Sequence, residues 1–269
     1  EVNRKGRVQW GDTWRVIHYV GLDSQEHVYS AGQRKRVQNV KVDLMQIGEE
    51  ELWGMVQDTV RGRRGQKGKQ LRVLLMGESP CCKTFSKTDS VNIGRGENYR
   101  LHGPGNTDRP PKDRGSEKGK AAVQADRMVR KGQRVAEWVH RRGAAFYMEN
   151  PVGSLQFRPY QVQWEQKGYV WRRVVHYCAF GHMYHKPTHI WTNMGQWAPV
   201  GQTGNGRCTV EGRCRTGRWS TAGKWEHRFK MAQASQQAQS GKGRKARKMM
   251  IPKGLQVELI QSAIAMQTK

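Results

Sequence analysis

Short apolar runs alternate along this chain with stretches whose apolar residues recur at helical spacing, and this alternation restricts the possible folds most. The runs predicted to be strands cover residues 16–23, 37–44, 71–77, 144–148, 174–180 and 189–192. The stretches with helical spacing cover residues 49–60, 121–142 and 255–264. Such alternation predicts an α/β fold with a mostly parallel sheet, helices on its faces and long basic loops. Ligands of such sheets bind beyond the carboxyl ends of the strands.

Chemically active side chains follow four of the predicted strands. Asp23 and Asp43 end the first two, where acidic groups can bind the ribose hydroxyls and adenine of a nucleotide-like cofactor. After the third strand, Cys81 and Cys82 stand just past a proline, where a thiol is held rigid and exposed as a nucleophile needs to be. After the fourth, Glu149 could donate or accept a proton. Singly, such an Asp is usually a helix cap and such a Cys a small hydrophobe, so the combination carries the argument.

The charge of the chain predicts a polyanionic partner. The sequence has 48 Lys and Arg against 22 Asp and Glu, a net charge of +26. Such an excess repels itself in a compact protein and is tolerable beside the phosphates of nucleic acid. Two basic runs are the expected phosphate contacts, formed by Arg61, Arg63, Arg64, Lys67, Lys69, Lys242, Arg244, Lys245, Arg247 and Lys248. The Trp and Arg residues of segment 213–225 are interpreted either as stacking groups for nucleic acid or as a small satellite core.

Cysteine usage and hydropathy bear on the compartment. Five cysteines form a poor disulfide framework, which favours a reducing intracellular compartment such as the nucleus or an organelle. The longest apolar runs are too short to span a bilayer, so no membrane association is expected. Cys208 and Cys214 could bind zinc together with Cys178 and the neighbouring histidines His176, His182 and His185. Their spacing matches no standard zinc finger, so they are interpreted as reduced thiols and no metal is expected.

Three runs of the sequence resemble one known family. The runs SPCCKTFS at 79–86, MENPVGSL at 148–155 and YCAFGHMYHKPTHIWTN at 177–193 resemble the cytosine-specific DNA methylases of phages and mobile elements. The resemblance extends from about Val16 to the C-terminus. It implies a Rossmann-like class I methyltransferase fold and transfer of a methyl group from S-adenosylmethionine to carbon 5 of cytosine in DNA, with the target base turned out of the duplex.

The resemblance also implies a role for individual residues. Cys82 would add to carbon 6 of the base, which makes carbon 5 reactive, and Glu149 would hold ring nitrogen 3 and the exocyclic amine. Asn150 would brace the Glu149 loop, while Lys186 and Thr188 fall where related enzymes contact the base. The segment 83–120 would be the mobile loop that closes over the site. The residues expected to bind the cofactor are Asp23, Asp43, Gly77 and Ser79.

Two departures from the family pattern shape the expected organisation. Cys81 stands where the family has a second proline, and no Gly-rich turn precedes Val16. Either the first strand and the cofactor turn are missing from this chain, or the cofactor site is degenerate. Methylation of an exocyclic amine is disfavoured, because two cysteines and no aromatic residue directly follow Ser79-Pro80. We expect a methyltransferase-like core at 1–195, a nucleic-acid-contacting segment at 196–250 and a helix at 251–269 packing back on the core. The alternative is a non-catalytic RNA-binding subunit of a large ribonucleoprotein, such as an organellar ribosome.

Overall fold

A computed structural model describes residues 7–10, 13–16, 19–23, 37–41, 45–62, 74–80, 82–86, 98–227 and 251–267. Its N-terminal part contains an antiparallel pair, β1 (Arg7–Trp10) with β2 (Thr13–Val16), and a parallel pair, β3 (Tyr19–Asp23) with β4 (Val37–Lys41). Helix α2 (Glu49–Gly62) follows. Neither pair is hydrogen-bonded to the larger sheet that forms the centre of the molecule.

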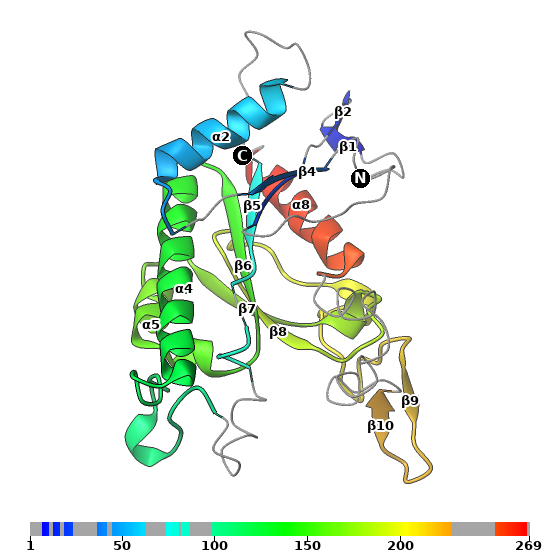
Figure 1. Ribbon diagram of the computed structural model, residues 1–269. Coiled ribbons are helices and arrows are strands. Elements are labelled where there is room, and N and C mark those ends of the chain that lie inside the picture. Colours follow the sequence, from blue (N-terminus) through cyan, green and yellow to red (C-terminus); the bar gives the residue numbers. More distant parts are fainter. Residues whose placement is uncertain are drawn as a thin grey trace.

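The central sheet has four strands in the order β5-β6-β8-β7, seen in Figure 1. These are β5 (Leu75–Glu78), β6 (Ala145–Pro151), β8 (Pro187–Thr192) and β7 (Trp171–His176). Strands β5 and β6 are parallel, but β8 runs antiparallel to both of its neighbours. The prediction of a mostly parallel, Rossmann-like sheet is therefore wrong. The connection from β7 to β8 holds only the short 3-10 helix η4 (Tyr177–Phe180), whereas a parallel crossover needs a longer connection, usually with an α-helix.

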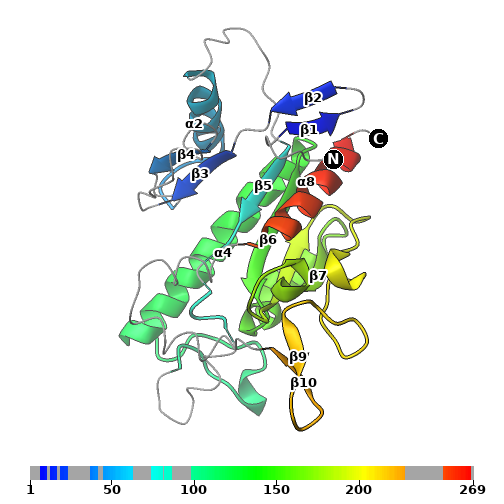
Figure 2. The ribbon, with the colours of Figure 1, turned by 90° about the vertical axis from the view of Figure 1, so that its right-hand side faces the viewer.

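Helices cover both faces of this sheet (Figure 2). Helices α4 (Glu117–Arg141) and α5 (Pro159–Glu165) pack on one face and α8 (Lys253–Gln267) on the other. Strand β6 supplies both layers, because alternate side chains of a strand point to opposite faces. Phe146 and Met148 lie in the core under α4, and Ala145 lies in the core under α8, where it meets Leu255 and Leu259. All five side chains are fully buried.

Most predicted elements are present with shifted bounds. The structure confirms the three predicted helices and lengthens each, and Ser116 caps α4 by accepting a hydrogen bond from the amide of Gly119 at 3.1 Å. The predicted strand at 174–180 is wrong in its second half, which forms η4. The segment expected to be irregular at 196–225 contains the short antiparallel pair β9 (Gly217–Trp219) and β10 (Trp225–His227). Further 3-10 turns are η2 (Pro104–Asn106), η3 (Ser154–Phe157) and η5 (Gly201–Thr203).

Within the described residues, no helix is both long enough and apolar enough to cross a membrane. This agrees with the short apolar runs of the sequence. The central sheet with its two helical layers instead provides the frame on which the candidate site is built.

Candidate active site

The predicted catalytic residues converge at one edge of the central sheet. Strands β5 and β6 are parallel with Glu78 opposite Met148, so the residues after β5 lie beside Glu149. Because β8 is antiparallel to β6, it brings its amino end to the same edge and pairs Thr188 with Pro151. The three quoted sequence runs therefore meet there, although they are far apart in the chain.

Glu149 is the centre of this edge. Its side chain is almost fully buried, at 2% exposure, and its Oε1 lies 3.0 Å from Nζ of Lys186. The hydroxyl of Ser79 donates a hydrogen bond to the other carboxylate oxygen, Oε2. The Lys186 ammonium also lies over the ring of Tyr177, 4.5 Å from its centroid. Burial, and then the nearby carboxylate of Glu149, raise the pKa of the Tyr177 phenol well above its usual value, which keeps the phenol neutral.

The turn that carries Cys82 is attached to the segment after Glu149 on both sides of the thiol. Before it, the Pro80 carbonyl accepts a hydrogen bond from Nδ2 of Asn150 at 3.3 Å. After it, the Phe85 carbonyl accepts one from the amide of Ser154 at 2.7 Å. The Cys82 carbonyl itself accepts from the Phe85 amide at 3.0 Å, which closes the turn. The structure thus hydrogen-bonds Asn150 to the turn that carries Cys82, whereas the resemblance implied that Asn150 would brace the Glu149 loop; its role at the site stays a prediction.

The second attachment requires a glycine. Ser86 and Gly153 form an isolated antiparallel bridge, and a Cβ at Gly153 would overlap the Phe85 carbonyl oxygen. A side chain at this position would therefore push the Cys82 turn away from β6. Cys82 itself is partly exposed and forms no disulfide.

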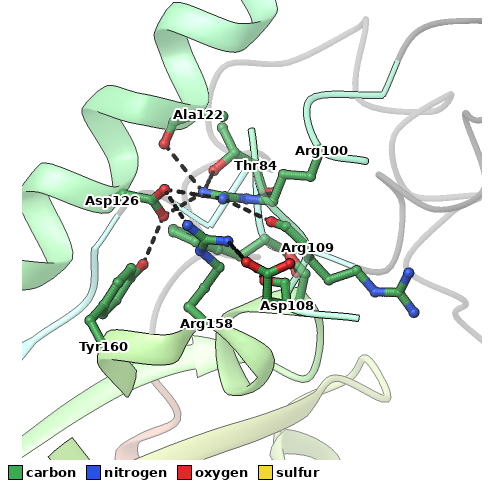
Figure 3. A network of polar contacts seen from close by, with 10 residues as sticks. Thr84, Arg100, Asp108, Arg109, Ala122, Asp126, Arg158 and Tyr160 are labelled. Atoms are coloured by element: carbon green, nitrogen blue, oxygen red, sulfur yellow. Dashed lines mark hydrogen bonds and ion pairs between the residues drawn. The ribbon is translucent and has the colours of Figure 1, made fainter. Parts of the chain in front are cut away.

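A buried ion cluster supports the same turn from the side of α4 (Figure 3). Arg100 is fully buried, and its guanidinium lies 2.8 Å from Oδ1 of Asp126 on α4. The same guanidinium donates to the Thr84 carbonyl at 2.9 Å and lies over the Phe85 ring, 4.2 Å from its centroid. A second arginine, Arg158, contacts Oδ2 of Asp126 at 3.2 Å. Arg100 thus joins the residues after Cys82 to α4, the longest helix of the described residues.

Sequence reasoning missed this cluster. Arg100 and Asp108 lie in a stretch without periodicity, where charged residues are usually solvated. Asp126 lies within a predicted helix, and its position gave no indication that it would be buried. Only the fold shows that the loop residue and the helix residue meet.

Glu78, at the end of β5, carries a second buried carboxyl. Its Oε2 is buried without a hydrogen-bond partner, and the carboxyl packs directly against Gly132 of α4, where a Cβ would overlap it. Burial in these surroundings raises the pKa of Glu78 to about 8. The group is therefore mostly protonated at neutral pH.

Of the four residues expected to bind the cofactor, the structure describes Gly77 and Ser79 in full, but not the side chain of Asp23 and not Asp43. Ser79 lies at the site with its hydroxyl on Glu149, and Gly77 packs closely against the ring of Tyr147. Asp23 ends β3, opposite Lys41 of β4, and its side chain is not among those described. Asp43 lies outside the described residues. Figure 2 draws the β3–β4 pair near the amino end of β5, and the cofactor roles of the two aspartates stay predictions.

The predicted phosphate contacts fall where the structure describes little. Arg61 belongs to the last turn of α2, and its side chain is not described. The other nine residues lie outside the described residues: Arg63, Arg64, Lys67, Lys69, Lys242, Arg244, Lys245, Arg247 and Lys248. Their role in nucleic-acid binding stays a prediction.

A second group of reactive side chains lies beyond the end of β7. The thiols of Cys178, Cys208 and Cys214 and an imidazole nitrogen of His227 all lie within 4.8 Å of one another. From the sequence, Cys208 and Cys214 are interpreted as loop thiols, and the pattern gives no reason to include His227. The pattern 178, 208, 214, 227 contains no short Cys-x-x-Cys pair, which is the signal that normally reveals such a group.

We compared the sequence with protein-family models and with curated proteins, and neither comparison found a match. The case for a function therefore depends on the arrangement of the side chains at the sheet edge. It also depends on the charge of the chain and on the three motifs.

Proposed function

We propose that this protein methylates carbon 5 of cytosine in DNA, with Cys82 as the nucleophile and S-adenosylmethionine as the methyl donor. The observation that carries the proposal is the double attachment of the Cys82 turn to the segment after Glu149. The turn that carries Cys82, a partly exposed residue, is thereby fixed to the strand that carries a buried carboxyl, and addition to a hydrogen-bonded base requires both groups.

The proposed chemistry assigns each group a step. The Cys82 thiolate forms a bond to carbon 6 as the double bond between carbons 5 and 6 opens, and its electron pair moves to carbon 5. Glu149 shares a proton with ring nitrogen 3, which stabilises the negative charge that this addition places on the ring. When bound, S-adenosylmethionine supplies an electrophilic methyl group. Loss of the carbon 5 proton to a base then expels Cys82 and restores the double bond.

The neighbours of Glu149 fit the recognition of cytosine. The Lys186 ammonium, 3.0 Å from Glu149, balances the buried carboxylate and can donate to the carbonyl oxygen of the base. Ser79 fixes the orientation of the carboxyl by its hydrogen bond. A site that pairs with the polar edge of one base rejects bases that leave these groups unpaired.

The substrate class is supported by charge. A net charge of +26 attracts a phosphate backbone. A base inside a duplex cannot reach an edge thiol, so the target cytosine must be turned out of the stack.

Mechanism-based trapping tests this function. The substrate is duplex DNA of random sequence with 5-fluorocytosine in place of cytosine. Its fluorine replaces the carbon 5 proton that must leave in the last step, so the covalent adduct remains. With S-adenosylmethionine present, we expect an adduct that survives denaturing gels and maps to Cys82. Cys82→Ser should abolish it, while Cys81→Ser, the adjacent matched control, should retain it. Glu149→Gln should slow adduct formation by about 10²–10⁴-fold.

Two results would overturn the proposal. One is an adduct on Cys81, and the other is a folded, DNA-binding chain that gives no adduct with saturating methyl donor.

The alternative function is an RNA-binding subunit without catalysis, which the large positive charge also favours. A titration with S-adenosylmethionine separates the two functions. Calorimetric heat from binding of S-adenosylmethionine to the full chain supports the enzyme. Salt-sensitive RNA binding, without cofactor binding and without a covalent adduct, supports the structural subunit.

A further inference from the structure

Three segments that are distant in sequence bring four metal-binding side chains together. Cys178 belongs to η4, Cys208 and Cys214 to the loop that follows η5, and His227 ends β10. The three cysteines are buried, and all are free thiols. The described part of the chain thus contains a compact set of three sulfurs and one imidazole nitrogen, separate from the Glu149 site.

The spacing of these atoms fits tetrahedral coordination. With bonds of about 2.3 Å to sulfur and 2.0–2.1 Å to nitrogen, tetrahedral zinc places sulfur about 3.6 Å from nitrogen. Nε2 of His227 lies 3.5 Å from Sγ of Cys208 and 3.2 Å from Sγ of Cys214. Only small side-chain shifts separate this arrangement from a coordination sphere.

Donors around the sulfurs match what thiolate ligands need. Sγ of Cys208 lies 3.4 Å from both the indole nitrogen of Trp225 and the backbone amide of Cys214. Sγ of Cys214 lies 3.1 Å from the hydroxyl of Thr216. Hydrogen bonds of this kind orient ligands and compensate thiolate charge in metal sites. Buried neutral thiols do not require them.

We propose that Cys178, Cys208, Cys214 and His227 bind a structural Zn²⁺ ion. Three thiolates and one neutral imidazole form the closed Cys₃His set of structural zinc sites, which leaves no open position for a substrate. A single disulfide would engage only two of these four groups. The set therefore favours a metal over oxidation.

The ion would join the sheet edge that carries Glu149 and Lys186 to the hairpin formed by β9 and β10. Cys178 directly follows Tyr177, whose ring contacts the Lys186 ammonium. At the other end, a hairpin of two three-residue strands is too small to be stable alone, so β9 and β10 need an anchor such as His227. Loss of the ion is expected to free the hairpin and to disturb the segment that carries Lys186.

Metal analysis of the full chain tests the proposal. Protein purified under reducing conditions without chelator should contain about one zinc ion per chain, measured by inductively coupled plasma mass spectrometry. Cys214→Ser and His227→Ala should each lower this content several-fold. Cys82→Ser, which removes a thiol outside the cluster, should leave it unchanged. Replacement of zinc by Co²⁺ should give a thiolate-to-cobalt absorption band, which Cys82→Ser should retain in full.

A second measurement applies even where a variant fails to fold. In the wild-type chain, Cys178, Cys208 and Cys214 should resist alkylation until a strong chelator is added, while Cys82 reacts throughout. Two findings would refute the site: absence of stoichiometric zinc from wild-type protein that also fails to take up Co²⁺, or a mapped disulfide between any two of the three cysteines under reducing conditions.

Discussion

Replacing Asp126 by Asn should destabilise the protein by about 3–5 kcal/mol, because it leaves buried arginine charge without a partner. The Asp126 carboxylate lies 2.8 Å from Arg100 and 3.2 Å from Arg158, and the two arginine side chains are 0% and 9% exposed. In the wild-type chain the Tyr160 hydroxyl donates a hydrogen bond to Oδ1 of Asp126 at 2.8 Å, and the asparagine amide oxygen can still accept this bond. The change therefore removes the charge while conserving shape.

The magnitude follows from what remains for each arginine. Arg158 still meets Asp108, whose side chain is 45% exposed, and Arg100 retains hydrogen bonds to carbonyl oxygens of Thr84 and Ala122. Neither arginine keeps a buried anion, so the cost is that of a broken buried pair. With a urea slope of about 2–3 kcal/mol per molar, the unfolding midpoint should fall by about 1–2.5 M.

Urea unfolding followed by tryptophan fluorescence measures this shift. The matched control is Glu117→Gln on the same helix, which removes an ion pair to Lys120 whose side chains are 91% and 61% exposed. That control should cost less than about 1 kcal/mol, since exposed pairs contribute little. Equal midpoints for Asp126→Asn and Glu117→Gln would refute the reasoning, because the cluster would then contribute no more than a surface pair.

Three further predictions concern other parts of the molecule. Burial raises the pKa of Glu78 to about 8, so the folded state holds a proton that the unfolded state releases above about pH 4.5. The free energy of unfolding should therefore decrease by up to a few kcal/mol as pH rises from about 4.5 to about 8. Glu78→Gln should flatten this pH dependence of stability, measured by urea titrations. Gly153→Ala should displace the Cys82 turn and reduce adduct yield at least tenfold, whereas Gly105→Ala, which meets no neighbour, should leave the yield unchanged; equal yields would contradict the proposed attachment. Affinity for duplex DNA should fall steeply as salt rises, and a flat salt series would exclude phosphate contacts as the source of binding.

The sequence predicted local structure better than strand direction. The apolar run before Glu149 predicted β6, and helical spacing predicted α4 and α8, because burial patterns are local signals. The direction of β8 depends on the connection from β7 and leaves no such signal in the strand itself. Helix α5 was missed because it is short, although a proline at its start gave a hint.

The candidate site shows the same division. Motifs in the sequence predicted Cys82, Glu149 and Lys186 as one group, since reactive residues in a fixed local order are visible in the sequence, and the structure pairs Glu149 with Lys186. The buried contact of Arg100 with Asp126 was not, because both residue types are usually solvated and their meeting depends on the packing of the loop on α4.

The side chains of β6 alternate between two cores, which limits the amino-acid substitutions that this strand tolerates. Phe146 and Met148 fill one layer and Ala145 the other, so a shift of this strand by one residue would exchange the two sets of side chains. The same shift would turn Glu149 away from Lys186. The position of the carboxyl is therefore locked to the packing of the whole domain, and substitutions within β6 should either leave the site intact or unfold the protein. Gradual loss of activity is instead expected from the Cys82 turn, which is held by a few hydrogen bonds and not by a layer of the core.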